Sequence, residues 1–306
     1  MITVHPAESC DQLLRATAAD GMIRAVGLVS THTVEEARQR HQLSYVATVA
    51  LGRTINAALL LAANLKESQA RINLQIKGDG PLGKVWVDAG IDGTVRGYVE
   101  NPAIELPLTE HSKLNVAQAV GRYGYLHVIR DQGYGVPYTS ATELVTGEIG
   151  DDITRYLAVS EQTPSAVLLG VMVNHEEVMV SGGILLQLLP GASVSLSREL
   201  EQRLTLVDEF SPLLAEGQSL EDLLNRYIGD LGLTILPGTQ QIRFHCRCSQ
   251  ERVKGALQML GQQELRTMIL EDKGAEATCH FCNQVYHVSE AELEEVLHTM
   301  QAASPR

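Results

Sequence analysis

The four cysteines nearest the C-terminus have the spacing of a metal site. Cys246, Cys248, Cys279 and Cys282 are four of the five cysteines in the chain, and they fall within 37 residues as C-x-C, 30 intervening residues and C-x-x-C. Two such pairs, brought together by a hairpin, can place four sulfur atoms about 2.3 Å from a Zn²⁺ ion in a tetrahedron. We therefore expect the chain to bind one zinc ion through these four cysteines.

Other side chains near the two pairs can assist the metal. His245, His280 and His287 are each able to replace a ligand. Because four thiolates already complete the shell, we interpret these histidines as hydrogen-bonding neighbours. Arg243 and Arg247 flank the first pair and can offset the excess negative charge of four thiolates around one dication.

The chemistry of four cysteines leaves more than one role open. Most closed four-cysteine sites are structural, so on chemistry alone a zinc that staples a small module is the favoured interpretation. A thioredoxin-type C-x-x-C site expects a βαβ context, which this region lacks. The same thiols can also be oxidised to disulfides, each of which removes two ligands at once. Cys10 stands apart and is interpreted as a lone buried or idle thiol.

The composition is that of an ordinary soluble globular protein and disfavours two classes of partner. The chain has 306 residues, of which 44% are hydrophobic and 20% are charged, enough for one large domain and one or two small ones. Its net charge of −13 repels phosphate backbones and anionic lipid, and its aromatic content of 4% disfavours base stacking. We expect no nucleic-acid partner and no membrane partner.

The N-terminus and the most apolar stretch indicate a cytoplasmic protein. The first residues have no basic start and no apolar run, so they do not form a secretory signal. Residues 45–65 are the most apolar long stretch, but Arg53, Asn56 and Asn64 lie within it, which favours a buried helix over a membrane span. In the cytosol thiols are kept reduced, so cysteines there are more often metal ligands or redox sensors than permanent staples.

Residues 1–190 are predicted to form an α+β core domain, because strand patterns between Gly and Pro turns alternate with helical patterns. Strands are expected at residues 22–28, 72–76, 85–87, 95–99, 125–129, 166–173 and 178–189, and helices at 33–42, 45–66, 115–120 and 151–160.

Residues 191–240 are predicted to form a helical linker. One helix is expected over residues 198–214, and Ser219 with Asp222 forms a capping box for a second helix. The apolar stripe of the second helix cannot be buried by the helix alone, so it must dock on another part of the protein. Both a permanent and a conditional docking fit this pattern. Between residues 198 and 230 three arginines oppose eight acids.

Residues 241–298 are predicted to form the small cysteine module, followed by a frayed tail at 299–306. The expected order is a strand at 241–245, a helix from Ser249 to residue 260, a short helix ending near 270, a tight turn between two strands within 278–288, and a last helix capped by Ser289 and Glu292.

One run of glycines matches the sequence motif of a dinucleotide-binding site. Residues 78–83 read GDGPLG and match G-x-G-x-x-G, which requires a strand before it and a helix N-terminus after it. Here strand patterns lie on both sides, so we interpret the glycines as turn residues. No spacing of histidines and acids singles out an acid–base pair, and no catalytic residue is assigned.

The chain resembles the 33 kDa chaperonins (heat shock protein 33 homologs), a family of redox-regulated molecular chaperones. The cysteine module carries this resemblance in the runs CRCS at 246–249, ERV at 251–253, LG at 260–261, EL at 264–265, ED at 271–272, GAE at 274–276, CHFCN at 279–283 and YH at 286–287. The core carries it at Tyr156, SEQTP at 160–164 and GGILLQLLPGA at 182–192. Residues 121–124, GRYG, diverge somewhat from the expected glycine-rich stretch.

The resemblance implies a three-part fold and a switch. It implies a core at 1–190, a helical linker at 191–240 and a zinc-binding redox-switch domain at 241–298, with the reduced, zinc-bound monomer inactive. Oxidation would pair Cys246 with Cys248 and Cys279 with Cys282, release zinc and unfold the switch and linker. The active form, a homodimer, would hold unfolding client proteins without ATP; the client-binding residues are left open.

Two rival functions predict different properties. An enzyme with its active site in the core and a structural zinc tail predicts a polar cleft and no response to thiol oxidation. A nucleic-acid-binding zinc module predicts a basic face, yet residues 241–298 carry six Lys or Arg against nine acids.

Overall fold

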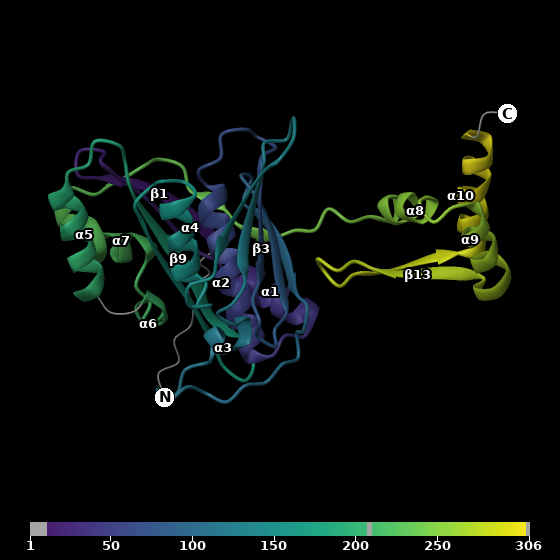
Figure 1. Cartoon of the computed structure of the whole chain (residues 1–306), viewed down its shortest axis with the longest axis horizontal. Helices are drawn as coiled ribbons and strands as arrows, with labels where there is room; N and C mark the ends of the chain where they lie inside the picture. The colour runs from purple at the N-terminus through teal and green to yellow at the C-terminus, as the bar shows by residue number, and fades with distance from the viewer. Residues whose placement is uncertain (1–10, 207–209, 304–306) are drawn as a thin grey trace. The chain divides into compact units, whose positions relative to one another are not determined.

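The computed structural model describes residues 11–206 and 210–303, and it confirms the predicted α+β class. The chain divides into two compact units, Met1–His245 and Cys246–Arg306 (Figure 1). The helices of residues 191–240 belong to the first unit. The functional division at residues 190 and 240 stays a prediction, and Cys10 lies outside the described residues.

Two antiparallel-rich sheets build the first unit. Sheet A has the order β10-β1-β2-β9-β8, with β11 also pairing with β1, and sheet B has the order β12-β5-β4-β3-β6-β7. The strands of sheet A are β1 Gln12–Ala18, β2 Ile23–Val29, β8 Ser165–Val173, β9 Val178–Leu188, β10 Thr234–Ile235 and β11 Gln240–Gln241. The strands of sheet B are β3 Arg71–Lys77, β4 Lys84–Gly90, β5 Thr94–Val99, β6 Tyr125–Asp131, β7 Tyr138–Glu143 and β12 Arg243–Phe244.

All seven strands expected in the core are present, but β1 and β7 were missed. The sequence of β1, QLLRATA, places Arg15 between its apolar residues, and that of β7, YTSATE, has almost no apolar alternation. Neither pattern predicts a strand by itself, because these two segments are stabilised as strands by pairing with their neighbours in the sheet. The glycine run at 78–83 lies in the turn between β3 and β4, as interpreted from the sequence.

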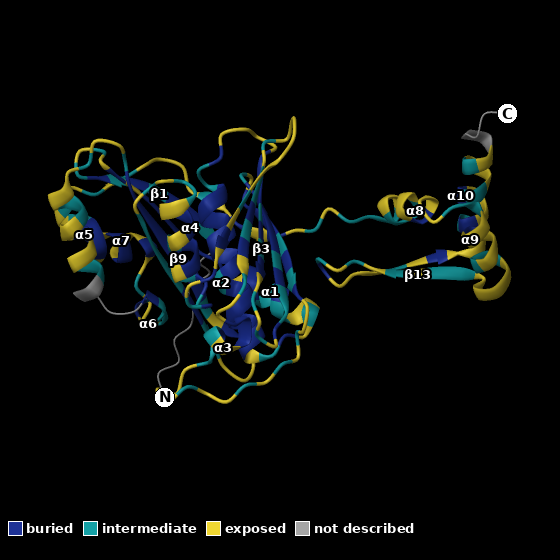
Figure 2. Ribbon diagram, in the orientation of Figure 1, coloured by how far each residue is buried: buried dark blue, intermediate teal, exposed yellow. Residues whose placement is uncertain are grey.

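The long apolar helix α2, Tyr45–Ala62, is the central element of the first unit. Ser44 caps it by accepting a hydrogen bond from the Ala47 N–H, and α2 packs against strands of both sheets (Figure 2). Among the described residues it is the one helix long and apolar enough to cross a membrane, and 89% of it is buried inside the protein. The other core helices are α1 Thr31–His41, α3 Val116–Val120 and α4 Gly150–Val159.

The described part of residues 191–240 is mainly helical, and its first helix begins at Val194, four residues before the predicted start at 198. The helices are α5 Val194–Leu206, α6 Phe210–Ala215 and α7 Leu220–Ile228. The predicted capping box of Ser219 and Asp222 is present at the start of α7.

Helix α7 docks its apolar stripe on sheet A. Its buried residues belong to one core cluster with residues of β1, β2 and β9. At Gly27 on β2, an added Cβ atom would lie 2.8 Å from the Cδ1 atom of Leu220, so the absence of a side chain makes room for the helix. The buried residues of α7 are Leu220, Leu223, Leu224, Tyr227 and Ile228.

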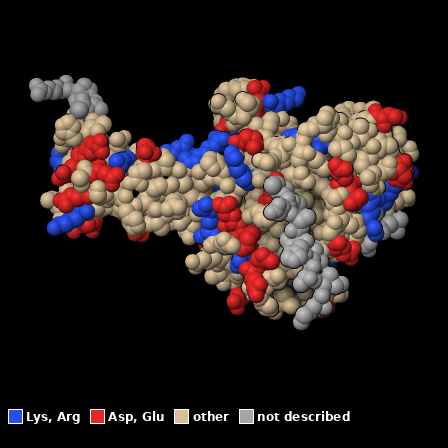
Figure 3. All heavy atoms as spheres, turned by 180° about the vertical axis from the view of Figure 1, so that it is seen from behind, with Lys and Arg blue, Asp and Glu red and all other residues tan. Residues whose placement is uncertain are grey.

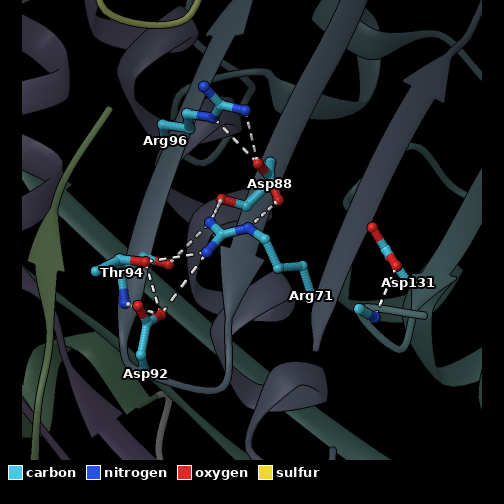
Figure 4. A network of polar contacts seen from close by, with 7 residues as sticks. Arg71, Asp88, Asp92, Thr94, Arg96 and Asp131 are labelled. Carbon is cyan, nitrogen blue, oxygen red and sulfur yellow. Dashed lines mark hydrogen bonds and ion pairs between the residues drawn. The ribbon is translucent and has the colours of Figure 1, made fainter. Parts of the chain in front are cut away.

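A buried ionic network fixes the turn between β4 and β5 (Figure 4). The Arg71 Nε atom lies 2.7 Å from the Asp88 Oδ1 atom, and Arg96 holds the second Asp88 oxygen at 3.0 Å. Arg71 also donates to Thr94 Oγ1 at 3.1 Å. In this turn the Gly93 carbonyl accepts a hydrogen bond from the backbone N–H of residue 243, so the network positions the last core strand before the cysteines.

The second unit is a hairpin covered by helices. Its elements are α8 Gln250–Gln258, α9 Gln262–Thr267, a π-helical turn Met268–Asp272, β13 Gly274–Thr278, β14 Val285–Ser289 and α10 Glu290–Ala303. The fully buried core is a small cluster of Leu257, Leu265, Val288, Leu293 and Val296. A core of this size supplies little folding free energy, so a unit this small usually needs a metal or a disulfide.

Candidate metal centre

The four cysteines predicted as ligands come together in the second unit. All four Sγ atoms lie within 4.8 Å of one another. The Sγ atoms of Cys246 and Cys279 are 3.7 Å apart, and those of Cys248 and Cys282 are 3.4 Å apart. Four sulfurs placed 2.3 Å from a tetrahedral zinc would be about 3.8 Å apart. The donor set therefore fits one zinc ion in both its chemistry and its dimensions.

Two local structures position the sulfurs. Cys279 and Cys282 lie in the turn that joins β13 to β14, where the Cys279 carbonyl accepts hydrogen bonds from the N–H groups of Cys282 and Asn283 at 3.3 and 2.8 Å. Asn283 adopts a left-handed backbone with φ of 57°, which closes this knuckle. Cys246 and Cys248 precede α8, whose first turn is capped by the Ser249 hydroxyl.

Burial makes two of the four thiols, those of Cys279 and Cys282, reluctant to ionise. Cys282 is 3% exposed, and the other three are partly buried. Desolvation raises the pKa of the Cys282 and Cys279 thiols, and the neighbouring Cys246 sulfur raises them further. A divalent cation reverses this preference, because the thiolate is the ligand form. A bound divalent cation would hold these two thiols in the ionised form that burial alone disfavours.

The histidines and the arginine that were expected near the cysteines lie on the surface and not within the cluster. His245, His280 and Arg247 are exposed, and the ligand cluster consists of the four cysteines alone. His287 is 76% exposed, and its Nδ1 atom lies 3.4 Å from a Glu276 carboxylate oxygen. The interpretation of the histidines as neighbours stays a prediction.

Tyr286 is a contributor to this site that the sequence analysis did not assign. It lies on β14, and its hydroxyl donates a hydrogen bond to the Cys248 Sγ atom over 2.9 Å. Tyr286 therefore links the hairpin that carries Cys279 and Cys282 to the other cysteine pair. The signal that could have found it is a tyrosine four residues after the C-x-x-C pair, on the strand that returns from the turn.

Removing the Tyr286 hydroxyl is expected to weaken metal binding. A hydrogen bond to a thiolate stabilises the charged ligand, so Tyr286→Phe should lower zinc affinity on the order of tenfold. Competition with a chromophoric chelator measures this affinity. Tyr123→Phe, which changes a tyrosine that is 81% exposed in the first unit, is the matched control. Equal affinities for wild type and Tyr286→Phe would show that the hydrogen bond does not matter to the metal.

The fold and the cysteine site together match a known family of chaperones. A sequence model described as Hsp33 protein matches residues 11–289. The chain belongs to the Hsp33 family.

The relatives cover nearly the whole chain. A 33 kDa chaperonin of Synechococcus sp. (strain JA-2-3B'a(2-13)) is 66% identical over 297 residues, which are 97% of this chain and 93% of that protein. A 33 kDa chaperonin of Gloeobacter violaceus is 55% identical over 296 residues, covering 95% of this chain and 97% of that protein. The crystal structure of the 33 kDa chaperonin (heat shock protein 33 homolog) of Thermotoga maritima superposes with a TM-score of 0.89 at 38% identity, covering 95% of this chain and 99% of that one.

Proposed function

We propose that this protein is an ATP-independent holdase that binds unfolding proteins and is controlled by a zinc/disulfide switch. The observation that carries the proposal is the cluster of four cysteine sulfurs within 4.8 Å, in a unit whose own core is small. Membership of the Hsp33 family supports the chaperone activity. The redox control rests on the chemistry of the sulfurs.

In the reduced state Cys246, Cys248, Cys279 and Cys282 would hold one Zn²⁺. When bound, the ion contributes folding free energy, on the order of 10 kcal/mol in comparable small zinc peptides. The cysteine module then stays folded and the protein is inactive. In this state the sulfurs act as thiolate ligands.

Oxidation converts the same sulfurs into disulfides. Each disulfide forms one S–S bond, gives two electrons to one peroxide molecule and, with the protons taken up, yields two water molecules. We propose the pairs Cys246–Cys248 and Cys279–Cys282. The 3.7 and 3.4 Å sulfur contacts run between the pairs, but in a tetrahedron every sulfur is near every other. Short loops favour closure within each pair once the module opens, because closing a loop of more than 30 residues costs more entropy.

Loss of the metal is proposed to release apolar surface for clients. The helical segment 191–240 would act as the conditional linker, and its docked stripe on sheet A would become available when it undocks. The lopsided acidic charge of this segment would keep the opened form soluble. The active form is proposed to be a homodimer in the cytoplasm.

The surface charge does not favour the nucleic-acid alternative. On the face drawn in Figure 3, acidic side chains are interspersed with the basic ones. A nucleic-acid surface needs a continuous basic patch or stripe. We propose no nucleic-acid and no membrane partner.

Oxidation of the zinc-loaded protein tests the proposal. Reduced protein is treated with peroxide under mild heat, and zinc release, free thiols and suppression of client aggregation without ATP are followed together. We expect four thiols to be lost, one zinc to be released per chain and aggregation to be suppressed only after oxidation. Peptide mapping by mass reports the disulfide pairs. Oxidation of all four thiols with no gain in aggregation suppression would contradict the switch.

A further inference from the structure

The β6–β7 hairpin ends sheet B with an open strand edge. β7 pairs with β6 over the full length of β7, and no strand in the described part of the chain pairs with its other side. The Leu144 N–H bonds to the Gly124 carbonyl, so by alternation the backbone groups of residues 139, 141 and 143 point away from β6. Such groups are a template for pairing with another extended chain.

Between its two ends this edge has none of the charged side chains that commonly protect edge strands. Residues 132–142, QGYGVPYTSAT, contain no charged side chain, in a chain that is 20% charged. Natural edges are commonly blocked by lysine, by inward charges or by a covering element. Here Pro137 precedes the strand, and the one charged residue of β7 is Glu143 at its C-terminal end.

Large apolar and aromatic side chains are exposed beside the open edge. Tyr134 is 68% exposed, Val136 is 94% exposed and Tyr138 is 65% exposed, and they lie within five residues of one another in the sequence. Aromatics make up only 4% of the chain, so two tyrosines left in solvent at one hairpin are a notable concentration. Exposed apolar side chains gathered together mark interaction sites, whereas singly scattered ones are ordinary.

We propose that the open edge of β7 binds an extended, apolar segment of an unfolding protein by strand addition. The backbone groups at 139, 141 and 143 would pair with the segment, while Tyr134, Val136 and Tyr138 would contact its side chains. This inference rests on the proposed holdase function and names one surface that would contact clients.

The charge of the surface favours a neutral apolar segment over a phosphate-bearing or acidic partner. The edge strand has no lysine or arginine, which are needed to hold phosphates, and its one charged residue is Glu143. The protein as a whole carries a charge of −13 and repels acidic chains, whereas the neutral stretch 132–142 accepts a neutral apolar segment without that penalty. Backbone pairing does not depend on the client's side chains, as a binder of varied unfolded proteins needs.

Substitutions at residue 141 block the edge without disturbing β6. Ala141 is exposed, and its N–H points outward, so Ala141→Pro removes one pairing group and leaves the β6–β7 ladder intact. Ala141→Lys keeps the N–H and adds an edge charge. The matched control is Gln75→Lys on β3, a strand whose two edges are paired with β4 and β6. A thermal unfolding transition for each variant checks that the variant is folded.

The probe is a labelled peptide of about eight residues with alternating threonine and valine or tyrosine, long enough to cover a strand. Its affinity for the oxidised full chain is measured by fluorescence anisotropy. We expect Ala141→Pro and Ala141→Lys to lose about tenfold in affinity and Gln75→Lys to retain it. Hydrogen exchange at residues 139, 141 and 143 should slow when the peptide binds.

Several outcomes would overturn the inference. One such outcome is that both Ala141 variants bind the peptide as tightly as wild type. A second is that the three amides are not protected when the peptide binds. A third is that the Ala141 variants differ from wild type only in losing self-association of the oxidised protein. In these cases oxidised wild-type protein would still suppress aggregation, and the proposed function would stand. Failure of oxidised wild-type protein to suppress aggregation would instead contradict the proposed function.

Discussion

Cys282→Ser is expected to abolish zinc binding and to unfold the second unit in the reduced protein. Cys282 is the most buried of the four sulfurs, and three remaining thiolates leave the tetrahedron open. Because the unit has only a small apolar core, loss of the metal removes folding free energy on the order of 10 kcal/mol. Zinc content and limited proteolysis of residues 246–306 measure the two effects.

The fifth cysteine provides the control for this substitution. Cys10→Ser makes the same chemical change outside the cluster, and we expect it to retain one zinc per chain. Under the proposed switch, Cys282→Ser should also suppress client aggregation without any oxidant. A variant that binds zinc as tightly as wild type, or that keeps residues 246–306 resistant to protease, would contradict the assignment of Cys282 as a ligand.

Leu223→Ala is expected to loosen α7 from sheet A and to give the reduced protein part of its chaperone activity. Leu223 is 0% exposed within the cluster that joins α7 to β1, β2 and β9. Removing a buried leucine side chain costs about 2–5 kcal/mol, which is large compared with what holds one short helix in place. Urea unfolding measures the loss, and aggregation assays under reducing conditions measure the activity.

A control substitution at an exposed residue of the same helical segment shows whether the effect of Leu223→Ala comes from the loss of buried contacts. Val194→Ala changes a residue that is 69% exposed at the start of α5, and it should alter neither stability nor activity appreciably. If Leu223→Ala undocks α7, as shown by faster hydrogen exchange at residues 220–228, but the protein with all five thiols reduced stays inactive, then the linker does not control client binding.

Residues close in the sequence were predictable because their interactions are local. The capping box of Ser219 and Asp222, and the hairpin that carries Cys279 and Cys282, depend on residues a few positions apart. The long apolar run that became α2 could be assigned from its composition alone. The start of the helix predicted at residue 198 was placed four residues too late, since α5 begins at Val194.

Contacts between distant residues could be seen only in the folded chain. The hydrogen bond from Tyr286 to Cys248 joins residues 38 positions apart, and the fit of Leu220 over Gly27 joins two segments that share no local pattern. β7 became a strand because β6 offers it a partner, and its outer edge is open because β7 is the last strand of that sheet among the described residues.

The sequence by itself indicated the class of fold, the family resemblance and the four cysteines proposed as ligands, because short cysteine spacings and hydrophobic periods report local chemistry. The tertiary structure decided how the four sulfurs meet, which hydroxyl reaches Cys248, where α7 is buried and which strand edge stays open. Those features depend on which surfaces pack together, and packing is set by the whole chain.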